Sequence, residues 1–233
     1  MSFTEELAEV VDDIFKTQWK TRDGDAVPEA EDVRLGNDAV LLDGTVLYAD
    51  LADSTKLVNN FPNWYAAEIY KSYLVCACKI IRNNGGEITA FDGDRVMAVY
   101  IGNSKNTAAV RSALQLAYVV QDVINPKLEA NYQNTNYRVT QSVGIDTSKL
   151  FVAKTGIRGA NDLVWVGRAA NYAAKLATLR EPGYSSFVTA DVFESMHESV
   201  KFGGPHNQLM WESRVWAKIN IGLYRSTWRW SPT

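Results

Sequence analysis

Two apolar segments of this sequence border an aspartate, and they constrain the fold more than any other feature. In the first, the run Val46–Ala49 leads directly into Asp50. In the second, Asp94 follows Gly93 and precedes the apolar run 96–100. We therefore expect each carboxylate to lie exposed at the end of a strand. An ordinary place in a turn or a helix cap is the alternative, because aspartate is common at both.

Paired carboxylates at strand ends suit divalent metal ions. Magnesium and manganese prefer oxygen ligands, and they share the phosphates of a bound substrate. A pair of such ions can stabilise both the attacking and the leaving oxygen in phosphoryl transfer. One interpretation of Asp50 and Asp94 is therefore a two-metal site for phosphoryl chemistry.

An alanine-rich segment, residues 165–179, is typical of a helix. Asn171 and Lys175 are four residues apart in it, so both side chains should project from one face. An amide and a cation one turn apart can hold a ribose and an α-phosphate. A solvated helix face is the commoner role of such a pair.

Taken together and in this order, the three segments resemble the catalytic domain of class III nucleotide cyclases. The segment Tyr48–Thr55 is similar to the strand end that carries the first metal aspartate in that family, and Gly93-Asp94 to the hairpin that carries the second. Asn171 and Lys175 fall where the family has its transition-state contacts. The resemblance covers about residues 40 to 225, and three ordered motifs are a stronger signal than any one alone.

The resemblance implies a fold, a metal requirement and an assembly. It implies an α+β sandwich with a mainly antiparallel sheet flanked by helices. Two divalent ions, Mn²⁺ or Mg²⁺, would bind Asp50, Asp94 and the backbone carbonyl of Leu51. Asn171 would orient the ribose of a nucleoside triphosphate, and Lys175 would neutralise developing charge. In that family a homodimer holds the sites at its interface, with these two halves on different protomers.

The departures from the family pattern concern the base. Ala90 stands where purine cyclases carry a base-reading lysine, and Val164 where they carry an aspartate, unless a shifted hairpin brings Asp162 there. An apolar pocket offers no hydrogen-bond partners to the polar edge of a purine. Tyr48 should share a strand face with Asp50, which makes it a candidate neighbour of the base, although a core or rim aromatic is the commoner reading. The family's helix arginine is Lys175 here, which keeps the charge without the planar fork.

At whole-chain level, the sequence most resembles the pyrimidine cyclases of bacterial Pycsar anti-phage systems. That subgroup makes cyclic UMP or cyclic CMP as a signal for a separate effector protein. The resemblance therefore favours UTP as the substrate, ahead of CTP. A purine cyclase and an inert nucleotide-binding regulatory module remain alternatives. A diguanylate cyclase or palm-fold polymerase is disfavoured because the Gly-Gly-Asp/Glu-Glu-Phe signature is missing from this sequence.

The last thirty residues are rich in tryptophan, and they contain one further candidate. Trp211, Trp216, Trp228 and Trp230 should belong to a core or an interface, because aromatic residues at this density usually do. Lys218 lies between them on an expected strand, near where the family places a lysine on the triphosphate. Lys218 is therefore a candidate substrate-binding residue.

Charge and hydropathy exclude several classes of partner. The net charge of −3 offers no basic surface for nucleic acid. No segment approaches the ~18 consecutive apolar residues of a membrane span. The chain begins with acidic residues and not with a basic signal-peptide head, so we expect a cytoplasmic protein.

The expected organisation is a short N-terminal segment followed by one catalytic domain. Residues 1–37 should contain a helix over 4–20 and a loop, and residues 38–233 the cyclase domain with tryptophan-rich C-terminal strands. Hydrophobic periodicity predicts the element order β-α-α-β-β-α-β-β-α. It places a long helix at 106–124, a strand at 138–146 and a hairpin at 151–165.

Overall fold

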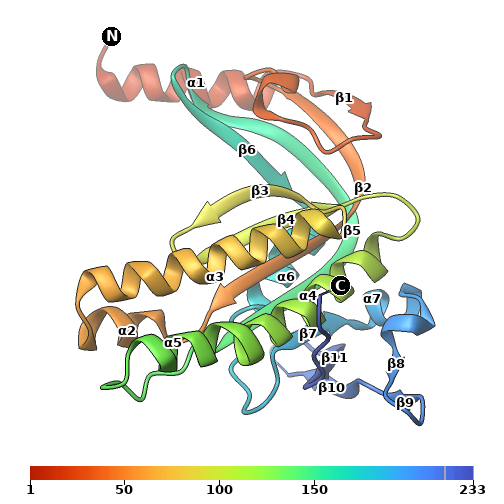
Figure 1. Cartoon of the computed structure of the whole chain (residues 1–233). Helices are drawn as coiled ribbons and strands as arrows, with labels where there is room; N and C mark the ends of the chain where they lie inside the picture. The colour runs from red at the N-terminus through yellow and green to blue at the C-terminus, as the bar shows by residue number, and fades with distance from the viewer. Residues whose placement is uncertain (218, 233) are drawn as a thin grey trace.

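The computed structural model describes residues 1–217 and 219–232 of the chain. A nine-stranded, mainly antiparallel sheet forms its centre, with helices on both faces (Figure 1). The strand order is β10-β11-β7-β5-β2-β4-β3, and β1 and β6 pair with the outer parts of β2 and β5. The predicted α+β class is confirmed, and so is the predicted element order from β2 to α6, except that α5 is an additional helix before β5.

The strands of the sheet are β1 Lys20–Asp23, β2 Asp38–Leu51, β3 Glu87–Asp92, β4 Arg95–Tyr100, β5 Gln141–Ile157, β6 Ala160–Val166, β7 Ser186–Thr189, β10 Glu212–Trp216 and β11 Ile221–Ser226. The helices are α1 Phe3–Lys16, α2 Ser54–Asn60, α3 Asn63–Asn83, α4 Lys105–Tyr118, α5 Asn125–Asn131, α6 Arg168–Leu176 and α7 Ala190–Ser195. A π-helix, Val119–Ile124, joins α4 to α5. Two 3₁₀ turns lie at Ala30–Asp32 and Glu198–Val200. A separate small sheet pairs β8, Phe202–Gly203, with β9, Gln208–Leu209.

Strand β2 is the axis of the sheet, and its alternating side chains build two separate cores. It pairs with β5 from Ala39 to Leu51 on one side and with β4 from Thr45 to Asp50 on the other. Because successive residues of a strand point to opposite faces, Leu47 and its odd-numbered neighbours join the core under α3 and α4. Val46 and its even-numbered neighbours join the core under α6. Asp50, the last even-numbered residue of the strand, therefore lies on the α6 face.

Two expectations about element boundaries are wrong. The strand at 138–146 and the first arm of the hairpin at 151–165 are one continuous strand, β5. Polar Ser148 and Lys149 suggest a break there, but their backbones pair with β2, which supplies the missing continuity. The helix expected at 106–124 ends at Tyr118 and continues as the π-helix and α5.

The N-terminal segment also differs from expectation. Part of the expected loop forms β1, which pairs with β2 in parallel. Helix α1 begins with a complete capping box between Ser2 and Glu5, and none of its residues is buried. It projects beside the β5–β6 hairpin at the top of Figure 1. The Asn37 amide ties its C-terminal end by donating to the carbonyls of Ile14 and Thr17 at 2.8 and 2.6 Å.

The C-terminal tryptophans belong to the core, as predicted. Trp211 and Trp216 are buried, and Trp228 and Trp230 pack against the core under α3 and α4. Within the part of the chain that the structure describes, no helix is long and apolar enough to cross a bilayer.

Candidate active site

The hairpin between β3 and β4 brings Asp94 next to Asp50. In the β2–β4 ladder Asp50 lies opposite Arg95, the residue that directly follows Asp94. Asp94 occupies the second position of a two-residue turn, and Gly93 before it has a φ of 62°. A positive φ at the first turn position suits glycine in a tight hairpin. The neighbouring strands β2 and β4 therefore place both carboxylates at the same end of the sheet.

Tyr73, on α3, lies close to both carboxylates. Its hydroxyl is buried and has no hydrogen-bond partner among the described residues. Burial raises its pKa well above the usual value, and the negative charges of Asp50 and Asp94 raise it further. The Oδ2 atom of Asp94 is likewise buried and without a partner in that part of the chain. Such an orphaned carboxylate oxygen costs free energy unless a donor or a cation occupies it.

Two arginines hold Asp50. Arg95 donates from Nε to Oδ1 at 3.2 Å, and Arg180 donates from Nη2 to Oδ2 at 2.7 Å. The expectation of an exposed carboxylate is wrong for Asp50, whose side chain is only 7% exposed, so these contacts compensate a nearly buried charge. The contact with Arg95 depends on the register of β4 against β2, and because α2, α3 and β3 lie between these strands in the chain, no local pattern predicts it. Arg180 follows α6 in a loop, and no pattern in the sequence indicates where that loop returns.

The oxygen atoms where β2 meets the β3–β4 hairpin are suitable ligands for divalent cations. Both carboxylates are hard oxygen ligands, and Leu51, the last residue of β2, directly follows Asp50. The orphaned oxygen of Asp94 is the observation that favours a cation there. No group of three or more histidine, cysteine or acidic side chains able to hold a metal is assembled within the described ranges. Substrate oxygens would therefore have to complete the coordination.

Helix α6 presents Asn171 and Lys175 on its exposed face. Its other face is buried against the sheet, where Gly144 of β5 allows a close approach. A Cβ at Gly144 would lie 2.2 Å from the carbonyl oxygen of Ala173 and 2.4 Å from the amide nitrogen of Ala177. The Asn171 amide donates to the Gly167 carbonyl at 3.3 Å. No hydrogen bond or ion pair joins Asn171 or Lys175 to the two aspartates in the part of the chain described.

Two arginine–aspartate pairs hold α6 to the sheet, and we call them the α6 clamp. At the first residue of the helix, Arg168 donates to Asp146 at 3.1 and 3.3 Å. Beyond its last turn, the Arg180 guanidinium bridges Asp50 and the Ala177 carbonyl, the latter at 2.7 Å. Both aspartates lie on strands at the centre of the sheet. The clamp therefore fixes Asn171 and Lys175 relative to β2 and β5.

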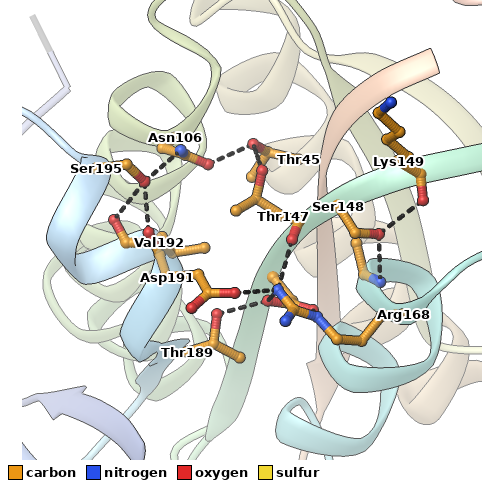
Figure 2. Close-up of polar contacts among 12 residues, drawn as sticks. Thr45, Asn106, Thr147, Ser148, Lys149, Arg168, Thr189, Asp191, Val192 and Ser195 are labelled. Carbon is orange, nitrogen blue, oxygen red and sulfur yellow. Dashed lines mark hydrogen bonds and ion pairs between the residues drawn. The ribbon is translucent and has the colours of Figure 1, made fainter.

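The first half of the clamp includes a buried charge. Asp146 is fully buried, and the Thr189 hydroxyl also donates to it. Figure 2 shows Arg168 extending from α6 toward Thr147 and Asp191, to which it also donates. Burial raises the pKa of Asp146, and the hydrogen bonds and the charge of Arg168 only partly offset this.

The residues expected near the base are only partly brought together. Tyr48 and Ala90 pack against one core, together with Leu163 and Trp165 of β6. Val164 has the opposite orientation on β6 and is 38% exposed, so it does not join this group. Asp162 is exposed, and its carboxylate accepts the backbone N–H of Leu163 at 2.7 Å. Lys218 lies outside the described residues.

Known proteins resemble this chain over its whole length. A uridylate cyclase of Xanthomonas perforans is 48% identical over 233 residues, which cover 99% of each chain. A uridylate cyclase of Burkholderia cepacia is 45% identical and covers 99% of this chain and 100% of the relative. A solved bacterial light-regulated adenylyl cyclase superposes with a TM-score of 0.69 at 21% identity, covering 82% of this chain and 54% of that one, and it supports the fold alone. No protein-family model matches the sequence.

Proposed function

Because this chain belongs to the uridylate cyclase family, we propose that it converts UTP to 3′,5′-cyclic UMP and pyrophosphate. The observation that carries the proposal is the 48% identity to a uridylate cyclase over both full lengths. The geometry supports it independently, because Asp94 and Asp50 occupy neighbouring positions of a β-hairpin and its partner strand.

In this proposal, Asp50, Asp94 and the Leu51 carbonyl hold one or two divalent ions. Bound there, Mn²⁺ or Mg²⁺ would make the ribose 3′-hydroxyl more acidic and offset phosphate charge. The 3′-hydroxyl gives its proton to water and its oxygen forms a bond to the α-phosphorus, while the bond from the α-phosphorus to the oxygen bridging it to the β-phosphate breaks and pyrophosphate leaves. Asn171 orients the ribose, and Lys175 offsets the charge that develops on the phosphate. Positioning and electrostatics supply most of the rate.

The exposed face of α6 leads us to propose a homodimer. Asn171 and Lys175 point to solvent and do not bond to the metal aspartates within the described ranges. A head-to-tail partner would bring these residues to the aspartates of the other protomer, giving two composite sites. A single protomer would then be nearly inactive.

The pocket chemistry supports a pyrimidine. Ala90 offers no polar group to a purine edge, and it lies beside Tyr48, because both are register partners of Met97 in β4. Val164 is exposed and does not join this group, so its position near the base stays a prediction. Lys218 stays a candidate for the triphosphate on the sequence resemblance alone.

We place this activity in cytoplasmic anti-phage signalling, in which cyclic UMP activates a separate effector. The support is the resemblance to the pyrimidine cyclases of Pycsar systems. The test is to express the chain with its genomic neighbours and challenge the cells with phage, using an Asp50→Ala variant as the control. Protection that persists in the variant would contradict a signalling role for the product.

The biochemical test is a substrate competition. Purified protein would be incubated with equal concentrations of ATP, GTP, CTP and UTP and with Mn²⁺, and the products identified by mass spectrometry. We expect cyclic UMP as the main product, because a site built for one base leaves buried groups unpaired with another. A dominant purine product would overturn the pyrimidine assignment and keep the cyclase assignment. No cyclic product at all would overturn both.

A further inference from the structure

We propose that Arg180 is a phosphate ligand of the substrate, and that it leaves Asp50 when metal and nucleotide bind. In the nucleotide-free chain, Arg180 would hold the metal-binding carboxylate; in the complex, it would hold the β- and γ-phosphates that depart as pyrophosphate. The inference rests on the proposed function and adds to it a residue that the family resemblance does not supply.

The position of Arg180 gives the first support. It lies four residues beyond α6, and its guanidinium reaches across to the end of β2, where Nη2 donates to Asp50 at 2.7 Å. The opposite nitrogen, Nη1, donates to the carbonyls of Ala177 and Leu179 at 2.7 and 3.0 Å. The side chain is 38% exposed, so a soluble ligand can reach it without unfolding the loop.

The charges around Asp50 give the second support. Two guanidinium groups, from Arg95 and Arg180, already compensate this single carboxylate. A divalent cation that approaches Asp50 meets both positive charges and finds both oxygens in use. The conflict disappears if Arg180 moves to an anion that arrives with the metal, and a nucleoside triphosphate is such an anion. Phosphate oxygens match the planar guanidinium fork at least as well as a carboxylate does.

The chemistry of α6 gives the third support. Lys175 carries a point charge where the resemblance expects an arginine, so this position lacks the bidentate fork. Arg180 supplies a fork five residues later. It would act in the site of its own protomer, because it bonds Asp50 of the same chain, whereas Lys175 would act across the proposed dimer. Phosphate recognition would then be shared between a lysine in trans and an arginine in cis.

A purely structural role is the competing explanation, since Arg180 also caps α6. The two roles differ in the sign of one measurement. If Arg180 only braces the loop, its removal should leave metal affinity unchanged or weaker. If Arg180 competes with the metal for Asp50, its removal should make metal binding tighter.

The experiment has two binding readouts and needs no turnover. Mn²⁺ affinity of the nucleotide-free protein would be measured by electron paramagnetic resonance. Binding of inorganic pyrophosphate would be measured by calorimetry at Mn²⁺ concentrations that saturate every variant. Arg180→Ala would be compared with Arg180→Lys, which keeps the charge without the fork. Arg214→Ala is the matched control, because it removes a half-exposed arginine paired with Glu212 on a distant strand.

We expect Arg180→Ala to bind Mn²⁺ about fivefold more tightly, since one positive charge near Asp50 is gone. Pyrophosphate should bind about tenfold more weakly, the loss typical of a charge-assisted hydrogen bond. Arg180→Lys should lie between Arg180→Ala and wild type, and Arg214→Ala should match wild type. Unchanged or weaker Mn²⁺ binding in Arg180→Ala, or unchanged pyrophosphate binding in that variant, would overturn the proposal. If Arg180→Ala does not fold, Arg180→Gln, which also removes the charge, gives the same two tests.

The outcome is separable from the proposed function. A wild-type chain that binds Mn²⁺ and pyrophosphate but forms no cyclic nucleotide would refute the cyclase and leave the Arg180 exchange to be decided by the variants. A wild-type cyclase whose Arg180 variants show neither change would refute the exchange alone.

Discussion

At the scale of single residues, Asp94 is the side chain whose surroundings favour a ligand over a structural role. Its Oδ2 atom is buried and has no partner among the described residues, although a carboxylate in a hairpin turn could readily point to water. Its neighbour Tyr73 has an orphaned hydroxyl as well. Two adjacent orphaned groups represent a local cost in stability that a bound cation would offset.

The first prediction concerns this residue. Asp94→Asn should lower kcat/KM by about 10³-fold or more, because a lost ligand charge removes several kcal/mol of transition-state stabilisation. Metal-free stability should stay the same or rise, since the variant no longer buries an uncompensated carboxylate. Turnover with Mn²⁺ and thermal unfolding in chelator would measure the two effects. Asp92→Asn, on the exposed part of the same hairpin, is the control. Near-normal turnover in Asp94→Asn would remove this residue from the site.

The second prediction concerns the helix cation. Lys175→Ala should lower kcat by roughly 10²-fold with a smaller change in KM, because the contact strengthens as charge develops in the transition state. Lys175→Arg, which keeps the charge, should retain most of the activity. Steady-state kinetics with UTP would separate the two constants. A rise in KM alone would make Lys175 a ground-state phosphate contact.

Residues differ in how far the sequence could predict them. The partnership of Asp50 and Asp94 was predictable, because each motif is local and the family resemblance orders them. The ion pair between Asp50 and Arg180 was not, because it depends on the path of a loop 130 residues later in the chain. The periodicity of the sequence carries no information about where that loop meets the rest of the fold.

At the scale of elements, the α6 clamp couples stability to the positions of Asn171 and Lys175. Arg168 and Asp146 fix the start of α6, and Ser148 of β5 accepts the backbone N–H of Ala169 at 3.0 Å in the same turn (Figure 2). A helix held only by its alanine face could slide along the sheet. The clamp restricts such movement, so Asn171 has a defined position before any substrate arrives.

The third prediction tests the clamp. Arg168→Met should lower the free energy of unfolding by about 3 kcal/mol or more at pH 7, because it leaves the buried carboxylate of Asp146 without its cationic partner. Asp146 has a raised pKa in the folded protein, and the substitution should raise it further. An aspartate with a raised folded-state pKa costs stability as the pH rises above its unfolded value of about 3.9. The deficit of the variant should therefore shrink between pH 7 and pH 4.5.

Urea unfolding at the two pH values would measure this effect. The double variant Arg168→Met/Asp146→Leu should recover most of the lost stability, because replacing both partners leaves no buried charge. An equal deficit at both pH values would show that Asp146 does not carry the penalty.

Element prediction succeeded where hydrophobic patterns were uninterrupted and failed where tertiary contacts override them. The order from β2 to α6 follows directly from such patterns. Strand β5 was divided in error, because polar Ser148 and Lys149 continue a strand only through their pairing with β2. The π-helix after α4 was missed as well, since an extra residue per turn leaves the local pattern of apolar residues helical.

At the scale of the whole molecule, the two groups of proposed site residues are not joined within the described chain. The aspartates lie where β2 meets the β3–β4 hairpin, and Asn171 with Lys175 lies on the exposed face of α6. The proposed homodimer would bring the two groups together across its interface.

The fourth prediction follows from that division. Asp50→Ala and Asn171→Ala proteins, each inactive alone, should recover up to about a quarter of wild-type activity when mixed in equal amounts. Half of the subunit pairs are then mixed dimers, and each mixed dimer has one intact site of two. Cyclic UMP formation after subunit exchange, followed by labelled subunits, would measure the recovery. Exchange without any recovered activity would place the whole site within one chain.

The long pairing of β2 with β5 also dictates how this protein is made. β2 is complete at Leu51, but its partner along thirteen register positions begins only at Gln141. At ordinary translation rates the ribosome needs on the order of ten seconds to add residues 52–140. During that interval β2 can pair only with β1 and with β4 of the β3–β4 hairpin, and the edge that later pairs with β5 stays open to neighbouring chains. Nascent chains on neighbouring ribosomes of one mRNA are therefore most prone to aggregate in the interval before β5 is synthesised. Slowly translated codons within residues 52–140 would lengthen that interval.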